Sequence, residues 1–170
     1  MLNTKPFAHL LSRHLRIIAT SAARDAVNAG ELLAAVHAAS GLPVEVISGE
    51  QEADWAFRGV LTDAAFGQRP LLILDVGGGS TEFILGHRGA MHFRHSFPLG
   101  SVRLLERLKI FDPPSAEDWR RCREEISATL ERDVLPLLTP HLTGEFAENL
   151  TLVGTGGATT ILARIHGGMT

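Results

Sequence analysis

Two glycine-rich loops with hydroxyl side chains are the parts of this 170-residue sequence best suited to chemistry. The first loop follows a short apolar run and reads Asp75-Val76-Gly77-Gly78-Gly79-Ser80-Thr81-Glu82. Three consecutive glycines remove every Cβ from the turn, so that backbone N–H groups can approach an anion closely. Ser80 and Thr81 add hydroxyl donors, and Asp75 is well placed to hold a hydrated Mg²⁺ against the same phosphate. The stretch therefore predicts a phosphate-binding loop.

The same residues also fit a plain β-hairpin turn. Leu71–Val76 is a short apolar run typical of a buried strand, and Thr81–Leu85 has the pattern of a second strand. The loop lacks both the lysine of a Walker loop and the spacing of a dinucleotide-binding fingerprint. The two interpretations are compatible, because the turn of a hairpin can itself bind phosphate, and the local sequence leaves both open.

A second loop of the same kind lies near the end of the sequence. The apolar run Leu150–Val153 predicts a strand, and it leads into Gly154-Thr155-Gly156-Gly157 and then into a helical pattern. Two strand-to-glycine-to-hydroxyl loops in one short chain are more informative than one. Together they indicate that two loops grip a single polyphosphate or nucleotide from different sides.

Charged residues at two predicted helix starts are further candidates. Ser48 and Gln51 form a capping-box pattern, which predicts a helix with Glu50 and Glu52 in its first turn. The helix dipole favours negative charge there, so simple helix-end electrostatics explains both glutamates as well as a catalytic role does. Arg24 lies in the first turn of another predicted helix.

The periodicity of apolar residues predicts an α/β protein. Strands are expected over Leu15–Ala19, Pro43–Ile47, Leu71–Val76, Thr81–Leu85, Met91–Phe97 and Leu150–Val153. Helices are expected from Phe7 to Leu15, over Ala22–Val27 and Glu31–Ala39, after Ser48, after Ser101, after Ser115 and after Thr160. The helix after Ser115 carries a stripe that we assign to the core, consisting of Trp119, Cys122, Ile126, Leu130 and Val134. Residues 62–70 are expected to connect two lobes, residues 1–65 and residues 66–170.

Composition narrows the function classes. The chain is 45% hydrophobic with a net charge of −3, which is typical of a globular protein and gives no broad nucleic-acid-binding face. No apolar run approaches the roughly 20 residues of a membrane span, and no secretory signal is evident. The single cysteine, Cys122, excludes an internal disulfide and a cysteine-based metal cluster. We therefore expect a cytoplasmic protein that binds neither nucleic acid nor membranes.

Taken in order, five segments resemble the exopolyphosphatase/guanosine pentaphosphate phosphohydrolase family, which is part of the acetate and sugar kinase, heat-shock ATPase and actin superfamily. The segments are Ala19–Asn28, Glu45–Ala53, Leu74–Glu82, Pro98–Gly100 and Val153–Gly157. The glycine loops alone would indicate only the superfamily, whereas Thr-Ser-x-x-Arg together with Ile-Ser-Gly-x-x-Glu-Ala is far more specific. The resemblance implies ribonuclease-H-like, actin-like lobes, each with a mixed sheet and flanking helices.

The resemblance also implies roles. Glu52 matches the glutamate that deprotonates the attacking water, and Arg24 matches an arginine that contacts substrate phosphate. Asp75 matches the acid associated with Mg²⁺, with Glu82 as a weaker candidate beside it. The residues that match phosphate-binding positions are Gly77, Gly78, Gly79, Ser80, Thr81, Gly154, Thr155, Gly156 and Gly157. The implied substrates are inorganic polyphosphate and guanosine pentaphosphate, with guanosine tetraphosphate as a possible ligand.

Two departures from the family pattern qualify these roles. The family usually has glutamate where this chain has Gln51, which we expect to alter local charge and not the base. The family also opens with a strand and an Asp-x-Gly-Ser-Asn-Ser phosphate loop, and no such segment occurs here. We therefore expect an incomplete first lobe and a second lobe truncated at its C-terminal end.

Two functions follow as alternatives. One is a phosphohydrolase that releases terminal phosphate with the help of Mg²⁺. The other is a catalytically incomplete fragment that only binds a phosphate-rich ligand or self-associates, for example as a homodimer through open sheet edges. A sugar or acetate kinase is less favoured, because the Ile-Ser-Gly-x-x-Glu segment is not a kinase feature.

Overall fold

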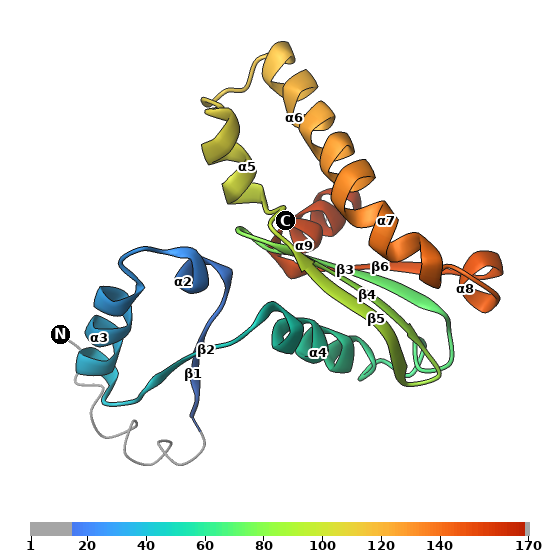
Figure 1. Cartoon of the computed structure of the whole chain (residues 1–170), viewed down its shortest axis with the longest axis horizontal. Helices are drawn as coiled ribbons and strands as arrows, with labels where there is room; N and C mark the ends of the chain where they lie inside the picture. Colours follow the sequence, from blue (N-terminus) through green and yellow to red (C-terminus); the bar gives the residue numbers. More distant parts are fainter. Residues whose placement is uncertain (1–14, 169–170) are drawn as a thin grey trace. The chain divides into compact units, whose positions relative to one another are not determined.

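The computed structural model describes residues 15–168, and the chain divides into two compact units, Met1–Ser48 and Gly49–Thr170. The predicted helix from Phe7 lies outside the described residues except for Leu15. In the first unit the elements are β1 (Ile17–Ala19), α2 (Ser21–Asp25), α3 (Ala29–Ser40) and β2 (Val44–Val46). In the second they are α4 (Gly49–Val60), β3 (Leu71–Val76), β4 (Thr81–His87), β5 (Ala90–Phe97), α5 (Ser101–Leu108), α6 (Ala116–Thr129), η1 (Leu130–Val134), α7 (Leu135–Leu138), η2 (Thr139–His141), α8 (Glu145–Glu148), β6 (Thr151–Thr155) and α9 (Gly156–His166) (Figure 1).

The first unit is a parallel pair of short strands connected by two helices. Strand β1 runs alongside β2 with Ile17 opposite Val44 and Ala19 opposite Val46. Parallel neighbours require a crossover, which α2 and α3 supply. The predicted break between the two helices is confirmed, although α3 begins earlier than expected, at Ala29, so that Gly30 lies inside it.

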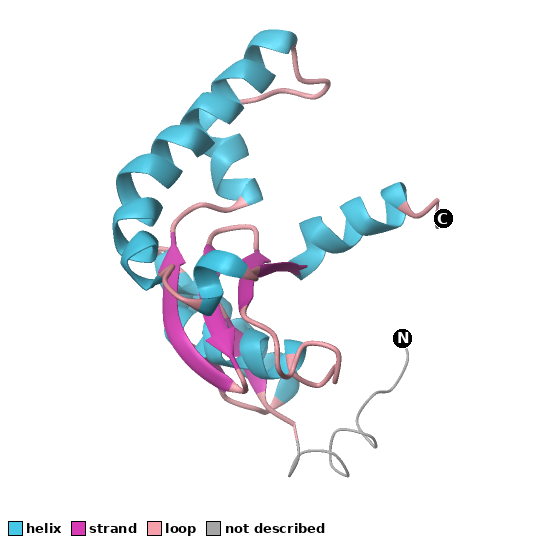
Figure 2. Ribbon diagram, turned by 90° about the vertical axis from the view of Figure 1, so that its right-hand side faces the viewer, coloured by secondary structure: helices cyan, strands magenta, loops and turns pink. Residues whose placement is uncertain are grey.

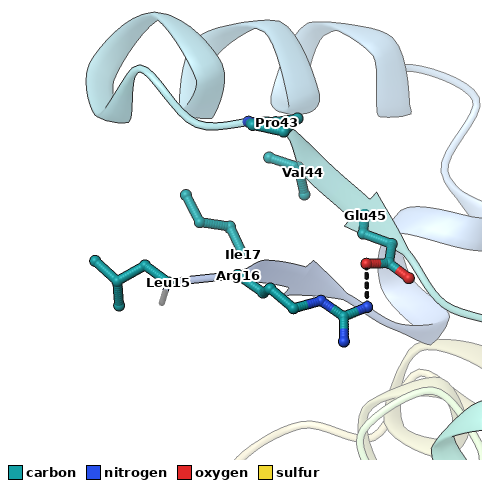
Figure 3. A pocket seen from close by; sticks show the side chains of 6 residues that line it. All are labelled: Leu15, Arg16, Ile17, Pro43, Val44 and Glu45. Carbon is teal, nitrogen blue, oxygen red and sulfur yellow. Dashed lines mark hydrogen bonds and ion pairs between the residues drawn. The ribbon is translucent and has the colours of Figure 1, made fainter. Parts of the chain in front are cut away.

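A hollow opens beside this strand pair. Its lining comes from both strands and the residues just before them, namely Leu15, Arg16, Ile17, Pro43, Val44 and Glu45 (Figure 3). The Arg16 guanidinium donates a hydrogen bond to the Glu45 carboxylate at its side. Because both side chains are exposed, this ion pair contributes little to stability.

The second unit is built on a mixed four-stranded sheet in the order β5-β4-β3-β6 (Figure 1). Strands β3, β4 and β5 form an antiparallel meander, whereas β6 lies parallel to β3. This arrangement confirms the predicted hairpin and the predicted mixed sheet with flanking helices.

Helices cover both faces of this sheet. On one face Ile73 and Ile84, both fully buried, pack against Ala53 and Phe57 of α4. On the other face a second cluster joins the sheet to the helices after it, and it consists of Phe83, Leu85, Phe97, Leu99, Leu104, Leu108, Val134, Leu138 and Phe146. Full burial of each large apolar side chain is worth about 1.5–3 kcal/mol, so these two clusters hold the sheet between its helices.

Two expectations require comment. Trp119 is 54% exposed, so its assignment to the core was wrong, because it lies in the first turns of α6 where that helix extends beyond the sheet. The compact units divide after Ser48, because α4 packs on the sheet of the second unit, and the predicted division into lobes at residue 65 stays a prediction. Among residues 15–168 no helix is both long and apolar enough to cross a membrane.

Candidate active site

The first glycine loop joins β3 to β4 and places two carboxylates side by side. Asp75 on β3 stands directly opposite Glu82 on β4, and Val76 stands opposite Thr81. Residues opposite each other in an antiparallel pair point to the same face of the sheet. Since side chains alternate along each strand, that face is the one that carries Ile73 and Ile84, which is the face covered by α4.

The glycines of this loop leave little room for side chains, since a Cβ on Gly77 would lie 3.2 Å from the Ser80 carbonyl oxygen and one on Gly78 would lie 3.2 Å from Val102 Cγ2. None of Gly77, Gly78 and Gly79 has a positive φ. A Cβ added to Gly100, just before α5, would lie 2.2 Å from the Gly78 carbonyl oxygen. The loop therefore packs backbone to backbone against the start of α5.

The second glycine loop lies next to the first. Strand β6 places Thr155 opposite Asp75, and α9 leaves the sheet from the end of that strand (Figure 2). Gly156 has a φ of +89°, and a Cβ on it would lie 2.5 Å from the Val76 carbonyl oxygen and 2.9 Å from Asp75 Oδ1. The predicted convergence of the two loops is thus present within the second unit.

One hydroxyl at this junction lacks a partner. Thr155 Oγ1 is buried and makes no hydrogen bond to any of the residues that the structure describes. Leaving a buried polar group unsatisfied costs free energy, so such an atom beside Asp75 is consistent with a ligand or a water that it would contact.

Helix α4 brings Glu52 to the same region. Ala53 and Phe57 anchor the helix to the sheet, and Phe57 fits against Gly86, where a Cβ would lie 2.1 Å from its ring. Arg94 of β5 pairs with Asp54 at 2.5 Å on one flank of α4. Glu52 lies on the other flank of the helix, since residues two apart in an α-helix point in nearly opposite directions.

Glu82 is the most perturbed carboxyl of this group. It is only 1% exposed, and this burial raises its pKa above the usual range for glutamate. The Ser96 hydroxyl donates a 2.6 Å hydrogen bond to Glu82 Oε1 and opposes that rise, while the negative charges of Glu52 and Asp75 add to it. Three carboxyl groups therefore lie within electrostatic reach of one another.

The remaining predicted catalytic residue, Arg24, lies in α2 of the first unit. Its Nη1 donates a 2.7 Å hydrogen bond to the Ile47 carbonyl oxygen, which fixes part of the guanidinium near the end of β2. All other predicted site residues lie in the second unit.

The donor set fits Mg²⁺ better than it fits a transition metal. No group of three or more histidine, cysteine, aspartate or glutamate side chains that could hold a metal ion occurs within residues 15–168. Mg²⁺ is commonly held by one or two carboxylates together with waters and substrate phosphates. Asp75, beside the unpartnered Thr155 hydroxyl, has this character. Glu82 is the weaker candidate, because it is 1% exposed and one of its oxygens accepts from Ser96.

Two contributors escaped the sequence analysis. Ser96 and Arg103 contact Glu82 and Gly79, respectively, across long stretches of sequence. Gly100 belongs to the family-like segment Pro98–Gly100, but its packing against Gly78 was not predicted. Ser96 could have been found from its place on the polar side of the Met91–Phe97 strand pattern. Nothing in the local pattern around Arg103 indicates that it reaches back to the glycine loop.

The second unit is therefore an α/β structure in which two glycine-hydroxyl loops meet at one end of a mixed sheet, beside the carboxyl groups of Asp75 and Glu82 on the sheet and of Glu52 on α4. The chain belongs to the Ppx/GppA phosphatase family, whose model matches residues 5–170.

Comparison with known proteins gives the same assignment. The chain is 36% identical over 173 residues to exopolyphosphatase 2 of Mycobacterium tuberculosis, covering 96% of this chain and 52% of that protein. It is 40% identical over 97 residues to a guanosine-5'-triphosphate,3'-diphosphate pyrophosphatase of Vibrio cholerae, covering 56% of this chain and 19% of that protein. The crystal structure of an exopolyphosphatase from Cytophaga hutchinsonii matches with a TM-score of 0.76 at 30% identity, over 95% of this chain and 51% of that one.

These relatives confirm the predicted family and the predicted α/β fold. The chain spans about half the length of the exopolyphosphatase relatives that it matches.

Proposed function

We propose that this chain carries the phosphate-binding and carboxylate half of a phosphohydrolase that releases terminal phosphate from inorganic polyphosphate or guanosine pentaphosphate. The observation that carries the proposal is the meeting of the two glycine loops beside Asp75 at the shared end of β3 and β6. Membership of the Ppx/GppA phosphatase family and the printed activities of the relatives support this reaction class.

In the proposed reaction Glu52 acts as the general base. It lies in the first turn of α4, close enough to Glu82 for the two carboxyl groups to interact electrostatically. Glu52 takes a proton from a water molecule as the water oxygen bonds to the terminal phosphorus. The bond from that phosphorus to the bridging oxygen breaks, and the products are inorganic phosphate and a chain shortened by one phosphate.

The other proposed roles are binding and charge neutralisation. The amides of Gly78, Gly79 and Ser80 and the groups of residues 154–157 hold phosphate oxygens, and Arg24 adds a guanidinium that can hold two oxygens at once. The Thr81 hydroxyl, predicted to bind phosphate, is buried and donates to the Leu99 carbonyl oxygen instead, and the Gly77 amide donates to the Ser80 carbonyl oxygen. Asp75 and Glu82 would hold Mg²⁺, which when bound neutralises charge that develops on the phosphate oxygens.

The test is phosphate release from polyphosphate and from guanosine pentaphosphate, measured on this chain with Mg²⁺ and with EDTA. We expect metal-dependent release that Glu52→Gln reduces at least about 100-fold, as is typical when a general base is removed. Glu50→Gln is the matched control, because Glu50 lies in the same helical turn but faces Arg94. Equal loss in both variants would refute the assignment of the base.

A binding function without catalysis is the second candidate. It is the second of the two alternatives that the sequence leaves open. Saturable binding of tripolyphosphate together with no phosphate release by a folded protein would support it. Neither binding nor release would contradict both candidates.

A further inference from the structure

The backbone carbonyls of the first glycine loop all point toward the start of α5. The Gly77 carbonyl oxygen accepts from the Ser101 amide at 3.1 Å, and the Gly78 carbonyl oxygen accepts from the Val102 amide at 2.9 Å. The Gly78 oxygen also accepts from the amide of Arg103, at 3.0 Å. The first three amides of α5, which a helix leaves without internal partners, are thereby satisfied by the loop.

The last carbonyl of the series is held by a side chain. The Gly79 carbonyl oxygen accepts a 2.6 Å hydrogen bond from Arg103 Nε, and the half-buried Arg103 side chain makes a further interaction as well. Among the described residues, no backbone amide of α5 donates a hydrogen bond to the Gly79 carbonyl oxygen.

These bonds determine where the amide groups of the loop point. In a trans peptide the C=O and N–H groups point in opposite directions. Because the carbonyls of Gly77, Gly78 and Gly79 all face α5, the amides of Gly78, Gly79 and Ser80 face away from it. Three successive amides on one side of a turn form the concavity that binds anions.

We propose that Arg103 is a positioning residue that sets the orientation of the Gly79–Ser80 peptide and so preorganises this loop for phosphate. The inference rests on the proposed phosphate-binding function of the same loop. A peptide that follows glycine can rotate at small steric cost, since no Cβ restricts it. If this peptide turned over, a carbonyl oxygen would replace the Ser80 amide in the anion-binding concavity and would repel phosphate.

The chain allows a closely matched set of variants. In Arg103→Gln the side-chain amide nitrogen occupies the same bonded position as Nε, so the donor is kept and the guanidinium is lost. Arg103→Met has the same length but no donor. Arg107→Met is the control for loss of positive charge from the same helix, because Arg107 pairs with Glu125 at 2.8 Å and not with the loop.

Two measurements test the proposal: ¹⁵N NMR of the Gly78, Gly79 and Ser80 amides without ligand, and calorimetric binding of tripolyphosphate. We expect Arg103→Met to broaden or split these resonances and to weaken binding about tenfold or more, the effect of one hydrogen bond from a charged donor. Arg103→Gln should keep single sharp resonances and bind within about threefold of wild type. Arg107→Met should match wild type in both measurements.

Other outcomes separate the possible failures. Unchanged ligand-free resonances in Arg103→Met would overturn the proposal. So would Arg103→Gln binding as weakly as Arg103→Met, since that result would assign Arg103 to direct phosphate contact. If the wild-type chain binds no tripolyphosphate, the proposed function fails, while the ligand-free spectra still decide whether Arg103 orders the loop. If Arg103→Met does not fold, loss of the sharp amide resonances or of near-wild-type binding in Arg103→Gln would overturn the proposal, because that variant keeps the donor.

Discussion

Substitution of Gly100 by alanine is the sharpest test of how the first loop is held. An alanine Cβ at this position would lie 2.2 Å from the Gly78 oxygen and 2.4 Å from the Gly78 carbonyl carbon. Contacts of a real Cβ shorter than 3.0 Å essentially never occur, so the loop and α5 must separate by about 0.8 Å. Neither neighbour is a flexible side chain that could move aside.

The size of the effect follows from this separation. Lengthening the 2.9 Å bond from the Val102 amide to the Gly78 oxygen by that amount would break it. Overpacking costs about 1–3 kcal/mol, and each lost hydrogen bond costs about 1 kcal/mol. We expect Gly100→Ala to lower the free energy of unfolding of the second unit by about 2–4 kcal/mol.

Urea unfolding followed by tryptophan fluorescence measures this change. Both tryptophans of the chain, Trp55 and Trp119, lie in the second unit, so the signal reports that unit alone. Gly59→Ala is the matched control, because Gly59 lies in α4 with no atom within 4 Å of the added Cβ. That variant should be stabilised by up to about 1 kcal/mol through higher helix propensity.

The two alanine variants therefore have opposite predicted signs for the same chemical change. A free energy of unfolding for Gly100→Ala within about 0.5 kcal/mol of wild type would refute the close approach of loop and helix. If both variants were destabilised equally, the effect would belong to glycine replacement in general. A loss confined to Gly100→Ala should be accompanied by weaker tripolyphosphate binding.

Three further outcomes can be checked with the same assays. The pKa of Glu82 is raised in the folded protein, so folding favours the protonated carboxyl. The stability that this gives is fully present below the ordinary glutamate pKa, about 4.5, and is lost as pH rises through the higher pKa of the folded state. Glu82→Gln should therefore become progressively more stable than wild type as pH rises above about 4.5, and a difference independent of pH would contradict this. In the capping box of α6 the Ser115 hydroxyl accepts a 3.1 Å hydrogen bond from the Asp118 amide, and Ser115→Ala removes this acceptor. The free energy of unfolding in urea should fall by about 1 kcal/mol in Ser115→Ala and by less in Ser115→Asp. Gly156→Ala should destabilise the second unit by more than about 1 kcal/mol, because Gly156 has a positive φ and the added Cβ would clash with Val76 and Asp75. No change in the free energy of unfolding would mean that the two loops lie further apart.

The sequence predicts the central elements of the second unit because their patterns are strong and local. An apolar run, a glycine turn and a second apolar run indicate a hairpin, and the helix expected after Ser115 begins at Ala116. Trp119 shows the limit of the same reasoning. Helical periodicity assigns it to the core stripe, but periodicity gives no information on where along the helix the covering sheet ends.

The sequence predicts which residues form the candidate site but not how these residues are arranged in space. Both glycine loops are evident from the sequence, and yet their contact depends on β6 pairing with β3 in parallel across more than 70 residues of intervening chain. The packing of α4 is hidden from the sequence for a similar reason. Whether α4 packs on one sheet or another depends on the fit of Phe57 against Gly86, which no local pattern contains.

The residues that the sequence analysis missed have a common physical cause. Motif reasoning looks for side chains that would touch the substrate, whereas Ser96 and Arg103 act on other groups of the protein, a buried carboxyl and a backbone carbonyl. A glycine-rich loop gains close approach to phosphate at the expense of intrinsic rigidity, since its peptides can rotate freely. The order that such a loop needs must then be supplied by donors elsewhere in the chain, and in this protein those donors lie at the start of α5, about 24 residues along the chain. A search for the first donors within reach of the carbonyls of such a loop would therefore identify residues that no sequence motif marks.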